Sequence, residues 1–223
     1  MRRFFVFPFA ACLISLLLLL SWTTLEEDKP EVYVAAEDKQ RGIHLFGPIS
    51  ERIAQLGDLG DHHVKWLVDV PFGWQEDHHS TQIKFSRGGG GAWRKDAAIR
   101  QLAQAAHARG QKVMIKPHIW LRQPTEKAWR GTIFFDQADD WKTWSNNYRD
   151  FILHYAHLCE ELDIAALCIG TELHKTVLHH PNYWRNLIRE VRKIYKGQLT
   201  YGANWDREYK DVPFWDELDF IGI

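Results

Sequence analysis

Short apolar runs alternate with helical patterns along most of this chain, and this alternation limits the fold more than any other feature. The clearest helix is residues 139–162, where apolar residues recur at steps of three and four. The expected strands are residues 41–46, 63–68, 111–117, 164–169, 198–202 and 218–223, and the other expected helices are 50–56, 95–109 and 181–195. Strands that alternate with helices pair in parallel through right-handed crossovers, so the sequence predicts an α/β fold.

Both a doubly wound sheet and a (β/α)8 barrel fit this alternation. A doubly wound dinucleotide fold should carry G-x-G-x-x-G after its first strand. Only Gly47-Pro48 stands there, and the glycine run at residues 88–91 follows no convincing strand. Polar and aromatic residues gather instead where the expected strands end, which is where barrel enzymes place their chemistry. We therefore predict a (β/α)8 TIM barrel that stops in this sequence after about six of its strands.

Residues 1–22 differ from the rest of the chain. Arg2 and Arg3 precede an apolar run over residues 4–22, which is long enough to span a bilayer and has no clear cleavage site after it. We expect an N-terminal hydrophobic helix, either a signal peptide or, preferably, an uncleaved membrane anchor. A polar linker over residues 23–40 and a catalytic-type domain over residues 41–223 should follow. The protein is then expected outside the cytoplasm, in the cell envelope or secreted, with membrane contact through its N-terminus.

Charge and composition exclude several classes of partner. The net charge is −1, with 28 Lys and Arg against 29 Asp and Glu, so nothing favours binding to nucleic acid. No cofactor is expected. Six of the 12 histidines stand in three adjacent pairs whose side chains diverge, and no H-E-x-x-H motif occurs, so we predict no metal site. Cys159 and Cys168 are expected to be buried thiols. The 11 Trp are expected mostly in the core, but exposed Trp is also what sugar rings stack on.

Side chains able to do chemistry follow three neighbouring strands. Lys116 and His118 end the third strand on the same side, Glu172 follows the fourth, and Asn204 and Trp205 follow the fifth. Each has a plainer reading: Glu172 as the polar start of a loop, Lys116 as its neutralising partner, and His118 as a core histidine. The carboxyl ends of parallel strands meet at one rim, and this convergence favours an active site.

A series of motifs in this order resembles glycoside hydrolase family 113. They include Lys116-Pro117-His118, Trp129-Arg130-Gly131, Gly170-Thr171-Glu172-Leu173 and Asn204-Trp205, and the match runs from about Gly42 to the end. The family consists mainly of β-mannanases on a (β/α)8 barrel, in a large clan of retaining glycosidases. The resemblance therefore implies hydrolysis of a neutral β-linked polysaccharide or oligosaccharide, first of all β-1,4-mannan.

The resemblance also implies roles for particular residues. Glu172 matches the acid/base, and a second carboxylate about 5 to 5.5 Å away would be the nucleophile. The clan places that nucleophile after strand seven, so it is expected beyond Ile223, in a chain that is either an inactive fragment or a degenerate relative. Lys116, His118, Asn204 and Trp205 match residues that hold the sugar, and Trp74, Trp120 and Trp129 are candidate stacking platforms. The alternative function is a non-catalytic glycan-binding or cell-envelope assembly module on the same fold.

Overall fold

The computed structural model describes residues 40–85, 96–125 and 127–223. The expected signal peptide or anchor, nearly all of the linker, and the glycine run at residues 88–91 lie outside the described residues. Within the described ranges, no helix is both long and apolar enough to cross a membrane.

A parallel sheet of five strands forms the centre of this part of the chain, and it confirms the α/β prediction. The strand order is β1-β2-β4-β6-β7, and every neighbouring pair is parallel. Their bounds are β1 (Gly42–His44), β2 (Trp66–Asp69), β4 (Lys112–Ile115), β6 (Ala166–Thr171) and β7 (Gln198–Gly202). The sixth expected strand, residues 218–223, contributes only an isolated parallel bridge between Gly202 and Gly222.

Four of the helices lie close to where the periodicity predicts them, and the others were not expected from the sequence. The four are α2 (Ile49–Ala54), α4 (Asp96–His107), α5 (Ala138–Glu161) and α7 (Pro181–Ile194), and the other α-helices are α3 (Leu56–Asp61), α6 (His174–His179) and α8 (Glu208–Asp211). Two short 3-10 helices are η2 (Arg130–Thr132) and η3 (Trp215–Glu217). Gln137 is at the N-cap of α5, and Asp139 lies in its first turn. There its carboxylate still faces the positive end of the helix dipole.

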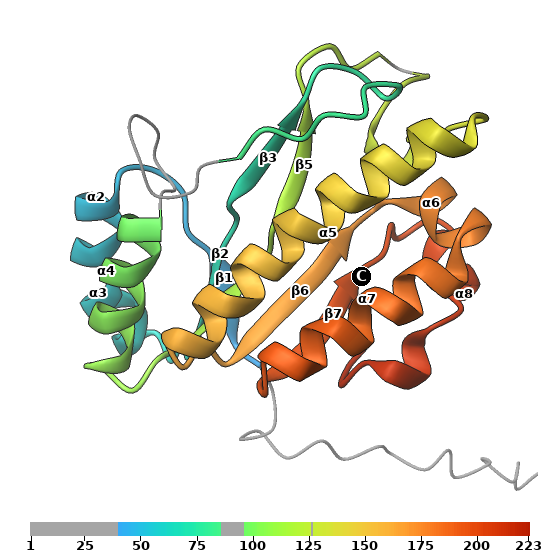
Figure 1. The fold of residues 1–223 in the computed structure, drawn as a ribbon. Helices are drawn as coiled ribbons and strands as arrows, with labels where there is room; N and C mark the ends of the chain where they lie inside the picture. Colours follow the sequence, from blue (N-terminus) through green and yellow to red (C-terminus); the bar gives the residue numbers. More distant parts are fainter. Residues whose placement is uncertain (1–39, 86–95, 126) are drawn as a thin grey trace, which may run out of the picture. The chain divides into compact units, whose positions relative to one another are not determined.

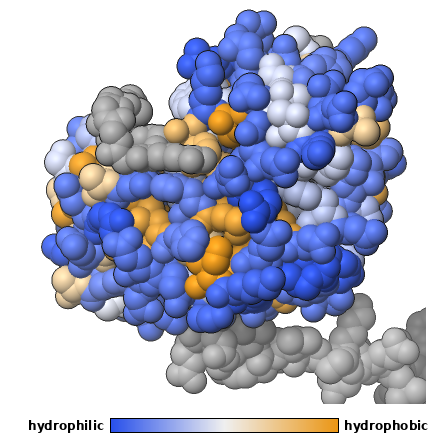
Figure 2. Space-filling view, viewed as in Figure 1, coloured by the Kyte–Doolittle hydropathy of each residue, from blue (hydrophilic) through white to orange (hydrophobic). Residues whose placement is uncertain are grey.

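Helices α5 and α7 run side by side along β6 and β7 (Figure 1). The inner side of α5 carries a fully buried aromatic row, and α7 adds the buried Trp184 to it. Tyr148 from this row donates its hydroxyl hydrogen to the Ile169 carbonyl of β6 at 2.9 Å. Hydrophilic side chains cover most of the outward face in Figure 2, with apolar side chains showing between them. The apolar sides of these helices therefore face the sheet and form the core.

A second sheet, which the sequence analysis missed, continues the line of β2 and β4. It consists of β3 (Phe72–Gln75) and β5 (His118–Leu121), paired in parallel. Pro71 precedes β3 and Pro117 precedes β5, and proline has no backbone N–H to donate to a ladder. The ladder therefore breaks at the prolines and resumes beyond them, so that β3 and β5 extend past the end of the main sheet (Figure 1).

Candidate active site

Glu172 stands immediately after β6, in a backbone conformation that side chains rarely adopt. Its φ angle is +52°, in the left-handed region, and its N–H donates to the carbonyl of Gly202 in β7 at 2.8 Å. Such a conformation persists at a non-glycine residue only where the surroundings hold it, and it is common at functional sites. The strand end therefore fixes the direction in which the Glu172 carboxylate leaves the sheet.

Packing behind β6 explains the glycine two residues before Glu172. A Cβ atom on Gly170 would lie 2.8 Å from a ring carbon of Tyr201 and 2.9 Å from one of Trp184. Both rings are fully buried. Only a residue without a side chain lets β6 pack this closely on them, which ties the Gly-Thr-Glu motif to the core.

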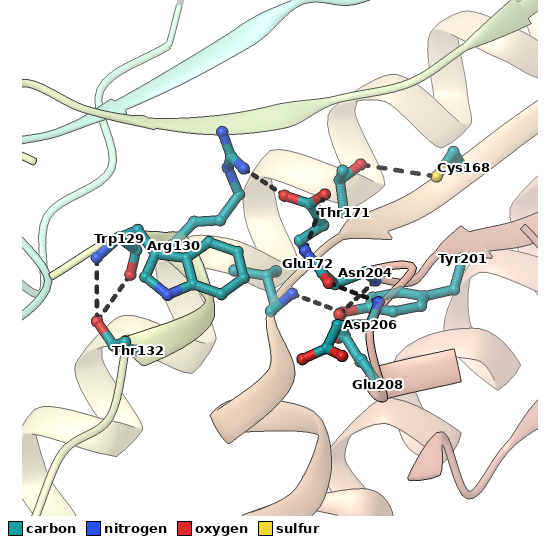
Figure 3. A network of polar contacts seen from close by, with 11 residues as sticks. Trp129, Arg130, Thr132, Cys168, Thr171, Glu172, Tyr201, Asn204, Asp206 and Glu208 are labelled. Atoms are coloured by element: carbon teal, nitrogen blue, oxygen red, sulfur yellow. Dashed lines mark hydrogen bonds and ion pairs between the residues drawn. The ribbon is translucent and has the colours of Figure 1, made fainter. Parts of the chain in front are cut away.

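The two oxygens of the Glu172 carboxylate face different partners (Figure 3). Arg130 forms an ion pair with Oε2 through its Nη1 atom, and the Asn204 side-chain nitrogen contacts Oε1 at 3.5 Å. The guanidinium of Arg130 also lies over the ring of Trp129, 5.9 Å from its centroid. Arg130 and Trp129 come from η2 and the residue before it, so the loop after β5 reaches the end of β6. Sequence reasoning missed Arg130 as a site residue, although the Trp-Arg-Gly motif could have indicated it.

Lys116 lies on the same side of the sheet but does not neutralise Glu172. Its Nζ atom is 3.7 Å from the position that a Cβ of Gly202 would occupy. Burial raises the pKa of the Cys168 thiol, and the positive charge of Lys116 is the first of the causes that oppose this rise. Within the part of the chain that the structure describes, the cation paired with Glu172 is Arg130, not Lys116.

A buried carboxylate, Glu208, lies behind Asn204. Its Oε1 atom accepts the Tyr201 hydroxyl at 2.5 Å, and its Oε2 atom accepts the Asn204 backbone N–H at 2.7 Å. Burial raises the pKa of Glu208, and these two hydrogen bonds oppose the rise. Its side chain is 1% exposed, so Glu208 has no free oxygen with which to attack a substrate. The sequence analysis gave this residue no role.

The aromatic candidates gather on β3 and β5. Trp74 and Trp120 are register partners with ring centroids 6.2 Å apart, and they are 38% and 46% exposed. Phe72 lies against Trp120 and against His118, with centroid distances of 5.4 and 5.7 Å. Four rings therefore form one partly exposed aromatic surface on this strand pair.

The three remaining candidates lie outside the aromatic surface of β3 and β5. Asn204 contacts the Glu172 carboxylate directly, and Trp129 contacts Arg130, which pairs with that carboxylate. Trp205 is 76% exposed in the loop after β7. Cys159 and Cys168 are buried and free. Among the described residues, no group of three or more His, Cys, Asp or Glu side chains could hold a metal ion.

Comparison with known families and structures identifies one family and several solved relatives. The model of Glycoside Hydrolase Family 113 matches residues 49–223. A search of curated proteins found no match. The GH113 β-mannanase AaManA from Alicyclobacillus acidocaldarius, solved in complex with ManMIm, is 30% identical, with a TM-score of 0.72 over 81% of this chain and 59% of that chain. A second GH113 β-1,4-mannanase, also solved as a complex, is 29% identical, with a TM-score of 0.67 over 78% of this chain and 54% of that one.

A more distant enzyme shares the fold alone. The endo-1,4-β-mannanase from Rhizomucor miehei is 11% identical, with a TM-score of 0.55 over 81% of this chain and 65% of that one. This chain therefore spans between half and two thirds of the length of these solved relatives.

Proposed function

The chain belongs to glycoside hydrolase family 113, and on that premise we propose that the protein hydrolyses β-1,4-mannan with retention of anomeric configuration. One observation carries the proposal: a carboxylate, Glu172, is held at the end of β6 by a left-handed backbone and contacted by Arg130 and Asn204. Active sites of barrel enzymes are built at this end of the strands.

In the proposed reaction, Glu172 gives its proton to the glycosidic oxygen while a second carboxylate attacks the anomeric carbon. The sugar–oxygen bond breaks and a covalent glycosyl-enzyme forms, which requires the two carboxyl groups to lie about 5 to 5.5 Å apart. Water then attacks the anomeric carbon while Glu172 takes its proton, and the bond between the sugar and the nucleophile carboxylate breaks, which releases the sugar and restores both carboxyl groups. Glu208 does not fit the nucleophile, because it is buried with both oxygens hydrogen-bonded. We propose that the nucleophile follows residue 223 in the whole protein.

The ion pair with Arg130 implies a rearrangement when substrate binds. The guanidinium meets Oε2 of Glu172 and Asn204 meets Oε1, so both oxygens already have a partner. A glycosidic oxygen can receive a proton only from an oxygen it can reach. We therefore propose that the substrate displaces one of these contacts on entering the site.

The remaining site residues are proposed to bind the sugar chain. Lys116, His118, Asn204 and Trp205 are assigned to the sugar at the cleavage point, and Trp74, Trp120 and Trp129 to stacking. The exposed rings on β3 and β5 support the second assignment, because aromatic faces bury the apolar faces of sugar rings while hydroxyl groups stay hydrated.

An extracytoplasmic location belongs to the same proposal and rests on the apolar run at residues 4–22. Mass spectrometry of the mature N-terminus tests the anchor: an intact N-terminus in a membrane fraction supports it, and a terminus beyond Trp22 contradicts it.

The function is tested on the whole protein with a panel of β-1,4-mannan, glucomannan and cellulose. We expect new reducing ends from mannan and, by proton NMR, β-configured products before mutarotation. An α-configured first product would contradict retention. Binding of mannan without any new reducing ends would contradict the enzyme and favour the glycan-binding module instead.

A further inference from the structure

Glu208 is a charged side chain placed where an apolar one would be expected. It lies at the start of α8, 1% exposed, between Tyr201 of β7 and the backbone of Asn204 (Figure 3). Burying a carboxylate is costly unless hydrogen bonds satisfy its oxygens. Here both oxygens accept a hydrogen bond, at 2.5 Å from Tyr201 and 2.7 Å from Asn204.

Each of these hydrogen bonds leads on to Glu172. The Tyr201 hydroxyl, which donates to Glu208, also accepts the N–H of Leu173 at 2.6 Å, and Leu173 directly follows Glu172. Asn204, whose N–H donates to Glu208, brings its side-chain amide to Oε1 of Glu172. One buried carboxylate therefore fixes both the backbone behind Glu172 and the amide beside its carboxylate.

We propose that Glu208 is a positioning residue for Glu172: it holds the acid/base and Asn204 in one geometry without touching the substrate. The inference rests on the proposed function and adds a residue to that site. The electrostatic coupling agrees with it, because the negative charge of Glu172 is among the causes that raise the pKa of Glu208.

A purely structural role for Glu208 is the competing explanation, and the chain offers a matched control for it. Tyr195 is a buried tyrosine like Tyr201, and its hydroxyl donates to the Ile164 carbonyl at 2.6 Å. Ile164 precedes β6, whereas Leu173 follows it. Tyr195→Phe and Tyr201→Phe therefore both remove a hydrogen bond between a buried tyrosine hydroxyl and the backbone at one end of β6, but only Tyr201→Phe also removes the donor to Glu208.

The kinetic experiment compares Glu208→Met, Glu208→Gln, Tyr201→Phe and Tyr195→Phe in the whole protein. For Glu208→Met we expect kcat on mannan to fall by about 10²-fold, the loss typical of a misplacement near 1 Å, with KM little changed. For Tyr201→Phe we also expect a lower kcat on mannan. Glu208→Gln should recover most of the rate, because its amide oxygen can still accept the Asn204 N–H and its amide nitrogen can donate to the Tyr201 hydroxyl.

Substrates with different leaving groups distinguish a positioning role of Glu208 from an effect on stability alone. Aryl mannosides with activated leaving groups need little protonation, so Glu208→Met should lose less kcat/KM on them than on mannan. Tyr195→Phe should lower Tm without this dependence on the leaving group. If Glu208→Met and Tyr195→Phe have equal kcat on mannan, or if Glu208→Met loses the same factor on both substrates, the positioning role is wrong. Should Glu208→Met fail to fold, Tyr201→Phe decides by the same criteria.

Crystal structures without substrate test the inference independently of activity. In Glu208→Met we expect Asn204 to leave the 3.5 Å contact with Glu172, and in Tyr195→Phe we expect that contact to stay. An unchanged contact in Glu208→Met would overturn the inference, even in an active enzyme. A wild-type protein that hydrolyses no glycan would instead overturn the proposed function and leave this structural comparison valid.

Discussion

Arg130 and Glu172 stand 42 residues apart in the sequence and form an ion pair at the end of β6. Each side chain keeps about a quarter of its surface exposed, so the pair lies at the wall of the site and not in the core. Arg130 lies in the loop after β5, and Glu172 directly follows β6, so the pair joins the segment after the β3–β5 sheet to the proposed acid/base.

Glu172→Gln should retain the fold but lose turnover. A glutamine side chain cannot donate a proton to the leaving oxygen, and losing a general acid lowers the rate by about 10² to 10⁴-fold. Substrates with activated leaving groups should lose less in the first step. The control is Glu161→Gln, which removes an exposed carboxylate at the end of α5 and should leave kcat unchanged. Near-normal turnover of mannan by Glu172→Gln would remove the basis for the proposed mechanism.

Trp120→Ala should weaken the binding of mannooligosaccharides. The ring is 46% exposed beside Trp74, so it can offer a flat apolar face to a sugar. We expect Kd to rise by about tenfold, which corresponds to the loss of an aromatic anchor at an interface. Calorimetric titration measures this, and Trp120→Phe, which keeps a ring, should lose less. Equal Kd values for wild type and Trp120→Ala would exclude the ring from the binding site.

Gly170→Ala should destabilise the protein, because the added methyl group meets the Tyr201 and Trp184 rings at 2.8 and 2.9 Å. Overpacking of this kind costs about 1 to 3 kcal/mol. Gly57→Ala in α3 is the control, since a Cβ there meets nothing within 4 Å. Alanine is favoured over glycine inside a helix by about 0.5 to 1 kcal/mol, so this variant should gain stability. Urea denaturation that ranks Gly170→Ala at or above wild type would contradict the packing argument.

Arg52→Met should cost far more stability than the loss of an exposed ion pair. Arg52 of α2 donates to Asp69 at the end of β2 at 2.7 Å, and both side chains are fully buried. Removing one partner of such a pair leaves the other charge buried without a counter-charge, which lowers the free energy of unfolding by about 3 to 5 kcal/mol. Arg100→Met, which breaks an exposed pair with Glu161, should cost at most about 1 kcal/mol. Similar free energies of unfolding for the two variants would contradict this prediction.

The raised pKa of Glu208 should make stability depend on pH. Burial is its largest cause, and the hydrogen bonds from Tyr201 and Asn204 and the charge of His174 act against it. The folded protein holds this proton to a higher pH than the unfolded chain, whose glutamates titrate near 4.5. The stabilising contribution is therefore complete below about pH 4.5 and is lost as the pH rises through the folded pKa.

The Glu208→Gln variant lacks this titration. We expect the free energy of unfolding of wild type, relative to Glu208→Gln, to decrease as the pH rises above the unfolded value of about 4.5. Chemical denaturation across this range measures the difference. A difference that stays constant, or that grows in favour of wild type, would show that burial does not raise the pKa of Glu208.

Local patterns in the sequence were enough to predict most of the main sheet and its longest helices. The helical spacing of apolar residues identified α4, α5 and α7 within one or two residues at each described end, and Gly110, with a φ of +68°, lies in the turn that follows α4. The sequence also predicted that Glu172 directly follows an apolar strand and that Cys159 and Cys168 are buried. Each of these features depends on neighbours a few residues away, which is why the sequence alone determined them.

Contacts between distant segments decided the rest. The strands β3 and β5 are four residues each and follow prolines, and only their pairing with each other makes them a sheet. The same holds for the partner of Glu172, which is Arg130 although Lys116 stands at a neighbouring strand end. The burial of Glu208 follows from the packing of α8 behind β7. The partners of a loop or side chain depend on which distant segments lie together in the folded chain. The spacing of residues in the sequence does not specify which segments these are.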